Sequence, residues 1–355
     1  MANPYYESAL KERAGVAQPV QVNPHYRRQK KAELSADDYV KGILDGNCTI
    51  LSRAITLIES ENPSHINLAQ TIIERCLPYS GNSLRIGITG VPGVGKSTFI
   101  ESFGGMLTAK GHKLAVLAID PSSERTKGSI LGDKTRMETL SVDPNAFIRP
   151  SPSGSALGGV ARKTRESVIL CEAAGFDIIL VETVGVGQSE TAVKSMVDFF
   201  LLLMLAGAGD ELQGIKRGIM EMADALVINK ADGDNLAKAH AAQSQYRAAL
   251  KLFPKSNNGW DVPVEICSAL ENFAIDKVWH IISDFYNFTK NNGSFEENRS
   301  TQLVNIFYNW IDFTLQNKFY NNDNMQSKIE TLLPKIKNKV ISPYLAAVKL
   351  TNGDF

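Results

Sequence analysis

The chain has 355 residues, and its composition, 43% hydrophobic and 21% charged, is that of an ordinary globular protein. Its 38 basic residues balance its 38 acidic residues, so no net positive field favours nucleic acid as a partner. Its four cysteines form no CxxC pair and its five histidines no HxxxH pair, which argues against a zinc site and favours reduced thiols in a cytoplasmic protein.

Residues 1–80 predict an N-terminal helical arm. Ser35 and Asp38 have the spacing of a capping box, and apolar residues follow at helical spacing. These apolar positions are Val40, Ile43, Leu44, Leu51, Ala54, Ile55 and Ile58, and a further helix places Ala69, Ile72, Ile73 and Cys76 on one face. Pro78 and the Ser-Gly-Asn-Ser run at 80–83 are expected to end the arm.

Residues 81–290 predict an α/β domain with a mostly parallel sheet flanked by helices. Short apolar runs alternate with helical or loop segments, which is typical of strands buried on both faces. The runs are 84–89, 114–120, 176–183, 199–206, 225–230 and 262–269. The most hydrophobic stretch, 199–209, is about half of the ~20 residues that span a bilayer, so we expect a buried strand and no membrane insertion.

A glycine-rich loop follows the first of these runs and fits GxxxxGK[ST]. Its place between a strand and a helix is the context that a phosphate-binding P-loop requires. Backbone N–H groups would cradle a phosphate, Lys96 would reach the β- and γ-phosphates, and Ser97 would ligate Mg²⁺. The predicted nucleotide-binding residues here are Gly90, Val91, Pro92, Gly93, Val94, Gly95, Lys96, Ser97 and Thr98. A plain strand-to-helix turn is the weaker alternative.

Two later strand ends indicate guanine as the base. Asn229, Lys230 and Asp232 form an NKxD motif, in which the carboxylate can accept from guanine N1–H and the exocyclic amine. Adenine does not offer that pair of donors. After the next run come Ser268, Ala269 and Leu270, whose backbone N–H groups could bind guanine O6. The expected ligands are therefore GTP and GDP.

Carboxylates at the same sheet edge are candidates for magnesium. Glu182 ends one apolar run and Asp120 another, and Asp133 lies in the loop after Asp120. Helix capping is the alternative role for each. Gly185 is expected to sense the γ-phosphate through its N–H, and no arginine can be assigned as a finger from spacing alone. Intrinsic hydrolysis is therefore expected to be slow and to be accelerated by a partner.

The C-terminal region, 291–355, predicts a helical extension. Residues 287–300 are rich in Asn, Lys and Ser and predict a linker. Helical spacing then returns, and the segment 321–327 should break the helix before a last amphipathic segment. The apolar stripe consists of Leu303, Ile306, Phe307, Trp310 and Ile311.

Several motifs together resemble the methylmalonyl-CoA mutase-associated GTPases of the MeaB type. They are GVPGVGKST at 90–98, AIDPSS at 118–123, GSILGDKTRM at 128–137, RPSPSGSALGGVA at 149–161, VETVGVGQSE at 181–190 and LAGAGDELQGIKRGIMEMAD at 205–224, together with NKAD and SAL. The similarity runs from about residue 36 to about residue 342. Lys127 departs from the family, which has a glycine there.

The resemblance implies a fold and a function. Members are GTPases of the SIMIBI class that form homodimers through a C-terminal helical extension. They act as G-protein chaperones of an adenosylcobalamin-dependent acyl-CoA mutase, such as methylmalonyl-CoA mutase. The resemblance makes Asp120, Asp133 and Glu182 metal-site or switch carboxylates. It also makes the loop 207–218, with Lys216, a switch toward the mutase.

Two other functional classes compete with this interpretation. A P-loop permits phosphotransferase chemistry, and relatives have been labelled arginine/ornithine-transport kinases, but the sequence offers no separate lid or acceptor base. A metallochaperone GTPase for another metalloenzyme would usually carry His- or Cys-rich segments, and none is present.

Overall fold

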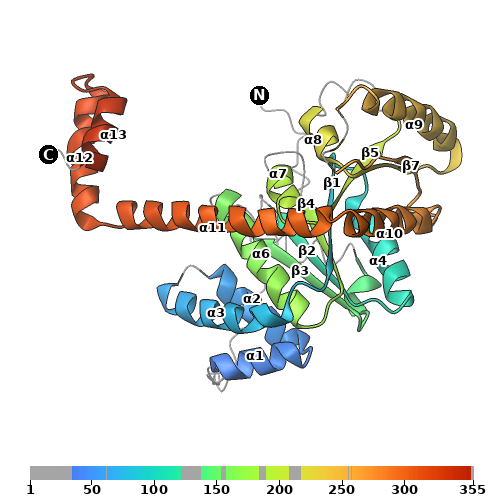
Figure 1. Cartoon of the computed structure of the whole chain (residues 1–355), viewed down its shortest axis with the longest axis horizontal. Helices are drawn as coiled ribbons and strands as arrows, with labels where there is room; N and C mark the ends of the chain where they lie inside the picture. Colours follow the sequence, from blue (N-terminus) through green and yellow to red (C-terminus); the bar gives the residue numbers. More distant parts are fainter. Residues whose placement is uncertain are drawn as a thin grey trace, which may run out of the picture. The chain divides into compact units, whose positions relative to one another are not determined.

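The computed structural model describes residues 34–352, except for 61, 121–136, 153–156, 184–188, 208–216, 255 and 257. Contacts divide the chain into two units, Met1–Ser35 and Ala36–Phe355. Everything below concerns the second unit (Figure 1).

Within the described residues, seven parallel strands form one sheet in the order β3-β2-β4-β1-β5-β6-β7. The six predicted strands are confirmed, and β3 was missed because it contains an arginine and two prolines. Its place at the sheet edge explains why prolines are tolerated there. The strands are β1 (Leu84–Gly90), β2 (Leu114–Asp120), β3 (Ala146–Pro152), β4 (Ile178–Thr183), β5 (Phe199–Leu205), β6 (Ala225–Asn229) and β7 (Val264–Ile266).

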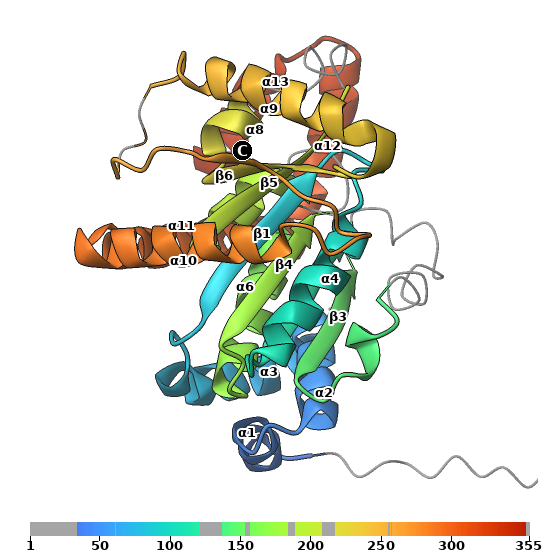
Figure 2. The same ribbon diagram turned by 90° about the vertical axis from the view of Figure 1, so that its right-hand side faces the viewer.

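Helices flank the sheet, as Figures 1 and 2 show. The α-helices are α1 (Ala36–Leu44), α2 (Cys48–Glu59), α3 (Pro63–Cys76), α4 (Lys96–Ala109), α6 (Leu157–Ala173), α7 (Ser189–Lys194), α8 (Arg217–Met222), α9 (Leu236–Leu250), α10 (Ile275–Asn291), α11 (Ser294–Tyr320), α12 (Asp323–Lys337) and α13 (Pro343–Asn352). Short 3₁₀ helices are η1 (Leu77–Tyr79), η2 (Leu140–Val142) and η4 (Gly233–Asn235).

Strand β5 shows how the core is divided between the two faces of the sheet. Leu201 and Leu203 pack with α4 and α10, whereas Leu202 and Met204 pack with α8 and α9. Because successive side chains of a strand point to opposite faces, an uninterrupted apolar run is what a doubly covered strand requires. The apolar runs of the sequence therefore mark the centre of the domain.

The apolar positions that follow helical spacing from Val40 to Ile58 belong to two helices, α1 and α2. Gly46 has a φ of +73°, a left-handed conformation that ends α1. The Asn47 side chain then accepts from the N–H groups of Thr49 (3.0 Å) and Ile50 (3.1 Å), which caps α2. Cys48 is exposed, whereas the other three cysteines are buried.

The predicted linker at 287–300 is wrong. Helix α10 continues to Asn291, and Gly293, with a φ of +79°, separates it from α11. The predicted stripe on α11 is helical, but Leu303 and Phe307 are 65% and 61% exposed. Among the described residues, no helix is long and apolar enough to cross a membrane.

A buried ion pair fixes the entry of β1. The Arg85 guanidinium donates to both carboxylate oxygens of Glu172 on α6, at 2.9 and 3.0 Å. Ser83 Oγ and the Gly81 N–H donate to the same carboxylate. Burial by itself raises the pKa of Glu172, but these donors outweigh it and hold the pKa below its ordinary value.

We expect Glu172→Gln to lower the free energy of unfolding by about 3–5 kcal/mol at pH 7, because it leaves Arg85 without its buried partner. A lowered pKa means that this stabilisation is present above the ordinary pKa of about 4.3 and is lost as the pH falls through the folded value. The gap between variant and wild type should therefore shrink in acid. Urea unfolding at pH 7 and at about pH 3 measures it, and Glu296→Gln, in an exposed pair with Lys290, is the control. Equal losses in both variants would contradict the assignment.

Candidate functional site

The glycine loop joins β1 to α4 in a conformation that side chains would obstruct. A Cβ on Gly90 would lie 2.5 Å from the Leu203 carbonyl oxygen of β5. A Cβ on Gly95, which has a φ of +91°, would lie 2.9 Å from Asn229 Nδ2. Close backbone approach and left-handed conformation are the two reasons for glycine in such a loop. The loop therefore presents backbone rather than side chains at the carboxyl end of β1.

Lys96 begins α4 and is buried beneath the loop. Its Nζ donates to the carbonyl oxygens of Gly90 (2.8 Å) and Val91 (3.4 Å). Burial lowers the pKa of the Lys96 ammonium, and the nearby charges of Glu182 and Glu190 oppose that shift. The hydrogen bonds of Lys96 to described residues go to neutral carbonyls, which phosphate oxygens could replace.

Ser97 and Glu182 meet at the same edge. Glu182 lies in β4 opposite Ile88 of β1 and is buried, and Ser97 Oγ lies 3.5 Å from its Oε1. A hydroxyl and a carboxylate oxygen are hard ligands of the kind that Mg²⁺ prefers. These two residues therefore fit one side of a magnesium site. Among the described residues, no group of three or more His, Cys, Asp or Glu side chains could hold a metal.

The other predicted phosphate-site residues are placed only in part. Asp120 is the last residue of β2, and the structure describes its backbone only. Asp133, Gly185 and Lys216 lie outside the described residues. Thr98 is exposed in the first turn of α4.

Asn229 connects the three predicted nucleotide motifs. Its Nδ2 donates to the Val94 carbonyl (2.9 Å), and its Oδ1 accepts from the Ala269 N–H (3.1 Å). Lys230, at a φ of +59°, donates from Nζ to the Gly93 carbonyl (2.8 Å). The phosphate loop and the two predicted base-binding loops are thus held as one unit.

Asp232 is oriented by a hydroxyl that the sequence analysis did not use. Ser268 Oγ donates to Asp232 Oδ2 at 2.5 Å, and the same Oγ accepts from the Glu271 N–H at 3.2 Å. Ser268 is fully buried, whereas Leu270 is 78% exposed. The sequence assigned only backbone N–H groups to 268–270, because the pairing of Ser268 with Asp232 depends on the adjacency of β6 and β7.

We expect Ser268→Ala to weaken GTP affinity about fivefold, because Asp232 loses the hydrogen bond that orients it, worth about 1 kcal/mol. Binding of a fluorescent GTP analogue measures the loss. Ser283→Ala, which removes a hydroxyl bonded only within α10, is the matched control. If both variants bind GTP as tightly as the wild type, Ser268 does not orient Asp232 for GTP binding.

Two further buried groups near the nucleotide loops were not predicted from the sequence. Glu190, in the first turn of α7, is 1% exposed and its charge acts on Lys96. The Cys267 thiol lies 3.6 Å from Asn229 Oδ1, and burial raises its pKa to about 12. Cys267 is therefore a neutral packing group beside Asn229 and not a nucleophile. The sequence signal for Glu190 was its place in the VETVGVGQSE motif.

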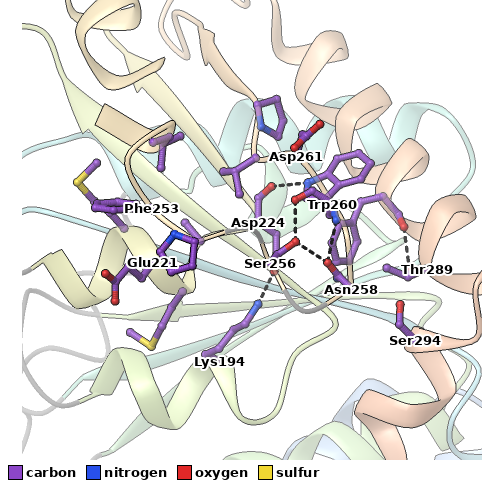
Figure 3. A pocket seen from close by; sticks show the side chains of 18 of the residues that line it. Lys194, Glu221, Asp224, Phe253, Ser256, Asn258, Trp260, Asp261, Thr289 and Ser294 are labelled. Carbon is purple, nitrogen blue, oxygen red and sulfur yellow. Dashed lines mark hydrogen bonds and ion pairs between the residues drawn. The ribbon is translucent and has the colours of Figure 1, made fainter. Parts of the chain in front are cut away.

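A cavity of about 1290 Å³ lies at the opposite edge of the sheet, beside the amino ends of β5, β6 and β7 (Figure 3). Its main polar groups already have partners. Lys194 Nζ donates to Asp224 Oδ2 at 2.5 Å, and Trp260 Nε1 donates to the Asp224 carbonyl at 2.9 Å. In parallel α/β sheets, ligands bind at the carboxyl ends of strands. We therefore place the functional site at the glycine loop and not in this cavity.

Comparison with known proteins gives consistent results. The family model described as "Methylmalonyl Co-A mutase-associated GTPase MeaB" matches residues 51–324. "GTPase ArgK" of Escherichia coli (strain K12) is 45% identical over 311 residues, covering 88% of this chain and 94% of the relative. "Methylmalonic aciduria type A homolog, mitochondrial" of Mus musculus is 43% identical over 327 residues, covering 89% of this chain and 79% of the relative.

A solved structure is similar in fold as well as in sequence. The "LAO/AO transport system kinase" superposes with a TM-score of 0.71 at 38% identity, covering 89% of this chain and 96% of that one. The family match, the GTPase relatives and the P-loop at the carboxyl edge of a parallel sheet agree. The chain belongs to the MeaB family of methylmalonyl-CoA mutase-associated GTPases and is a P-loop GTP hydrolase.

Proposed function

We propose that this chain is a magnesium-dependent GTPase that serves as a G-protein chaperone of an adenosylcobalamin-dependent acyl-CoA mutase. The observation that carries the nucleotide assignment is Asn229, which bonds both the phosphate loop and Ala269. Asp232, oriented by Ser268, would then read the N1–H and amine of guanine. Guanine specificity follows because adenine would leave the half-buried Asp232 carboxylate without matching donors.

The phosphate chemistry is assigned to residues of β1, α4 and β4. Lys96 would leave the Gly90 and Val91 carbonyls for the β- and γ-phosphate oxygens. Ser97 and Glu182 would hold Mg²⁺, which supplies charge neutralisation on the phosphates when it is bound. From the motifs alone, we add Asp120 and Asp133 as metal ligands, the Gly185 N–H as a γ-phosphate donor and Lys216 as a switch cation.

The client assignment rests on the family and its relatives. The family description names methylmalonyl-CoA mutase, and the mouse relative is named for methylmalonic aciduria. We propose the cytoplasm as the site of action, on the ground of the unpaired, mostly buried cysteines.

We further propose that the chain forms a homodimer through its C-terminal extension. The apolar face of α11 supports this, because Leu303, Phe307 and Tyr308 are each at least 60% exposed on one helix. Several large exposed apolar side chains on one helix are typical of a protein interface.

The test is GTP hydrolysis with an adenosylcobalamin-dependent acyl-CoA mutase from the same organism. We expect slow turnover alone and faster turnover with the mutase, at saturating GTP and Mg²⁺. A cobalamin-independent acyl-CoA enzyme is the matched protein control. Turnover that responds to neither protein, or equally to both, would contradict the chaperone assignment while leaving the GTPase intact.

A further inference from the structure

The start of α11 is clasped to the turn that follows α7. Arg299 Nε donates to Asp198 Oδ1 (2.8 Å), and its Nη2 donates to Asp198 Oδ2 (2.7 Å). Gln302 Nε2, three residues along α11, donates to the Val197 carbonyl (2.8 Å). The Asp198 side chain is 1% exposed and that of Arg299 is 16% exposed. This clasp is buried and bidentate, so it differs from an ordinary surface ion pair.

The clasp also reaches the strand that carries the phosphate loop. Asp198 Oδ2 accepts from the Arg85 N–H (2.8 Å), and the Asp198 N–H donates to the Arg85 carbonyl (2.8 Å). Arg299 donates to the carbonyl oxygens of Ser83 (2.5 Å) and Gly81. The beginning of β1, the beginning of β5 and the first turns of α11 are therefore joined through two side chains.

Helix α7 connects this clasp to the nucleotide edge. Val193 lies so close over β1 that a Cβ on Gly87 would be 2.8 Å from its Cγ1. Glu190, in the first turn of the same short helix, is buried and close enough to Lys96 to act on its ammonium charge. A phosphate that draws Lys96 away from the loop carbonyls would change the charge that Glu190 faces. Because GTP brings one more phosphate than GDP to Lys96, the force on α7 would differ between the two nucleotides.

A second contact ties the middle of α11 to α6. The Arg162 guanidinium lies 4.8 Å from the ring centroid of Trp310 and 4.2 Å from that of Phe313. Arg165, one turn farther along α6, donates to Ser195 Oγ at 2.6 Å. Ser195 also belongs to the turn after α7. Helix α6 therefore contacts both elements that the clasp joins, α11 and this turn. The first half of α11 is thereby held to the body of the domain.

We propose that the turn 195–198 couples the nucleotide site to α11. In this arrangement Arg299 and Gln302 are positioning residues, and a shift of α7 between nucleotide states is passed to α11 through Asp198 and the Val197 carbonyl. The proposal rests on the nucleotide site of the proposed function. It requires no contact between α11 and the nucleotide. Since coupling between sites is reciprocal, loosening the clasp must also change the ratio of GTP to GDP affinity.

Hydrogen exchange of the full chain, with Mg²⁺ and either GDP or a non-hydrolysable GTP analogue, tests the proposal. We expect amides in the first half of α11 to exchange at rates that differ at least about tenfold between the two states. In Arg299→Gln, that difference should collapse, and the ratio of GTP-analogue to GDP affinity should change by a similar factor. Gln302→Met, which keeps the side-chain volume but removes the amide, should reduce both effects. If Arg299→Gln does not fold, Gln302→Met decides the test.

Arg247→Gln is the matched control, because Arg247 makes its contacts with β7 and none with α11. It should behave as the wild type. Equal exchange of α11 in both nucleotide states, or a difference that survives in the folded clasp variants, overturns the coupling. Nucleotide binding is measured on the same samples with a fluorescent analogue. A wild type that binds both nucleotides without a response in α11 refutes only the coupling, whereas a wild type that binds neither refutes the proposed nucleotide site as well.

Discussion

Lys96→Ala is expected to lower kcat for GTP hydrolysis about a hundred- to a thousandfold, because the variant loses the cation that neutralises charge on the phosphates in the transition state. The fold should survive. Burial lowers the pKa of this ammonium, so its desolvation is a cost in the folded protein, and the variant should melt at the same temperature as the wild type or higher. Phosphate release at saturating GTP and thermal unfolding measure the two effects.

Lys110→Ala is the control for this prediction. Lys110 follows the other end of α4 and is exposed. Its replacement by alanine removes the same charge far from the loop. This variant should hydrolyse GTP as the wild type does. If Lys96→Ala retained more than a tenth of the activity, Lys96 would not be the phosphate cation.

Asp232→Asn is expected to weaken GTP binding about a hundredfold, or ~2.7 kcal/mol, because a charged acceptor of two guanine donors becomes an amide. Xanthosine triphosphate should gain affinity, since the amide can donate to the second oxygen of xanthine. Competition of GTP, XTP and ATP against a fluorescent guanine nucleotide measures the change in specificity.

Asp234→Asn, two residues along in η4 and exposed, should leave all three affinities unchanged. An Asp232→Asn variant that still prefers GTP over XTP would remove Asp232 from the base site. Loss of affinity for all three nucleotides together would assign Asp232 a structural role.

Local motifs carried most of what could be predicted. The glycine loop, NKAD and SAL are contiguous, and each lies directly after an apolar run, so a parallel sheet brings them to one edge. The pairing of Ile88 with Glu182 places the predicted carboxylate opposite β1, next to the strand's phosphate loop. Continuous apolar runs were sufficient to identify six of the seven strands in the described part of the chain.

The remaining features depend on contacts between distant residues. Ser268 bonds to Asp232, and Arg299 bonds to Asp198, which lies more than a hundred residues away in the sequence. No spacing rule reveals either pair. Strand β3 lacks a continuous apolar run because it lies at the edge of the sheet. The false linker at 287–300 arose because Asn, Lys and Ser occupy exposed positions at the junction of α10 and α11, where they say little about the backbone.

The most direct test of the central claim follows the terminal phosphate of GTP and of ATP. Purified protein with Mg²⁺ is given each labelled nucleotide, with and without arginine or ornithine as acceptor. The account predicts that phosphate is released to water from GTP, that ATP is turned over at least about a hundredfold more slowly, and that neither amino acid becomes labelled. Turnover of ATP at a rate comparable to GTP, or transfer of the label to an amino acid, would contradict it.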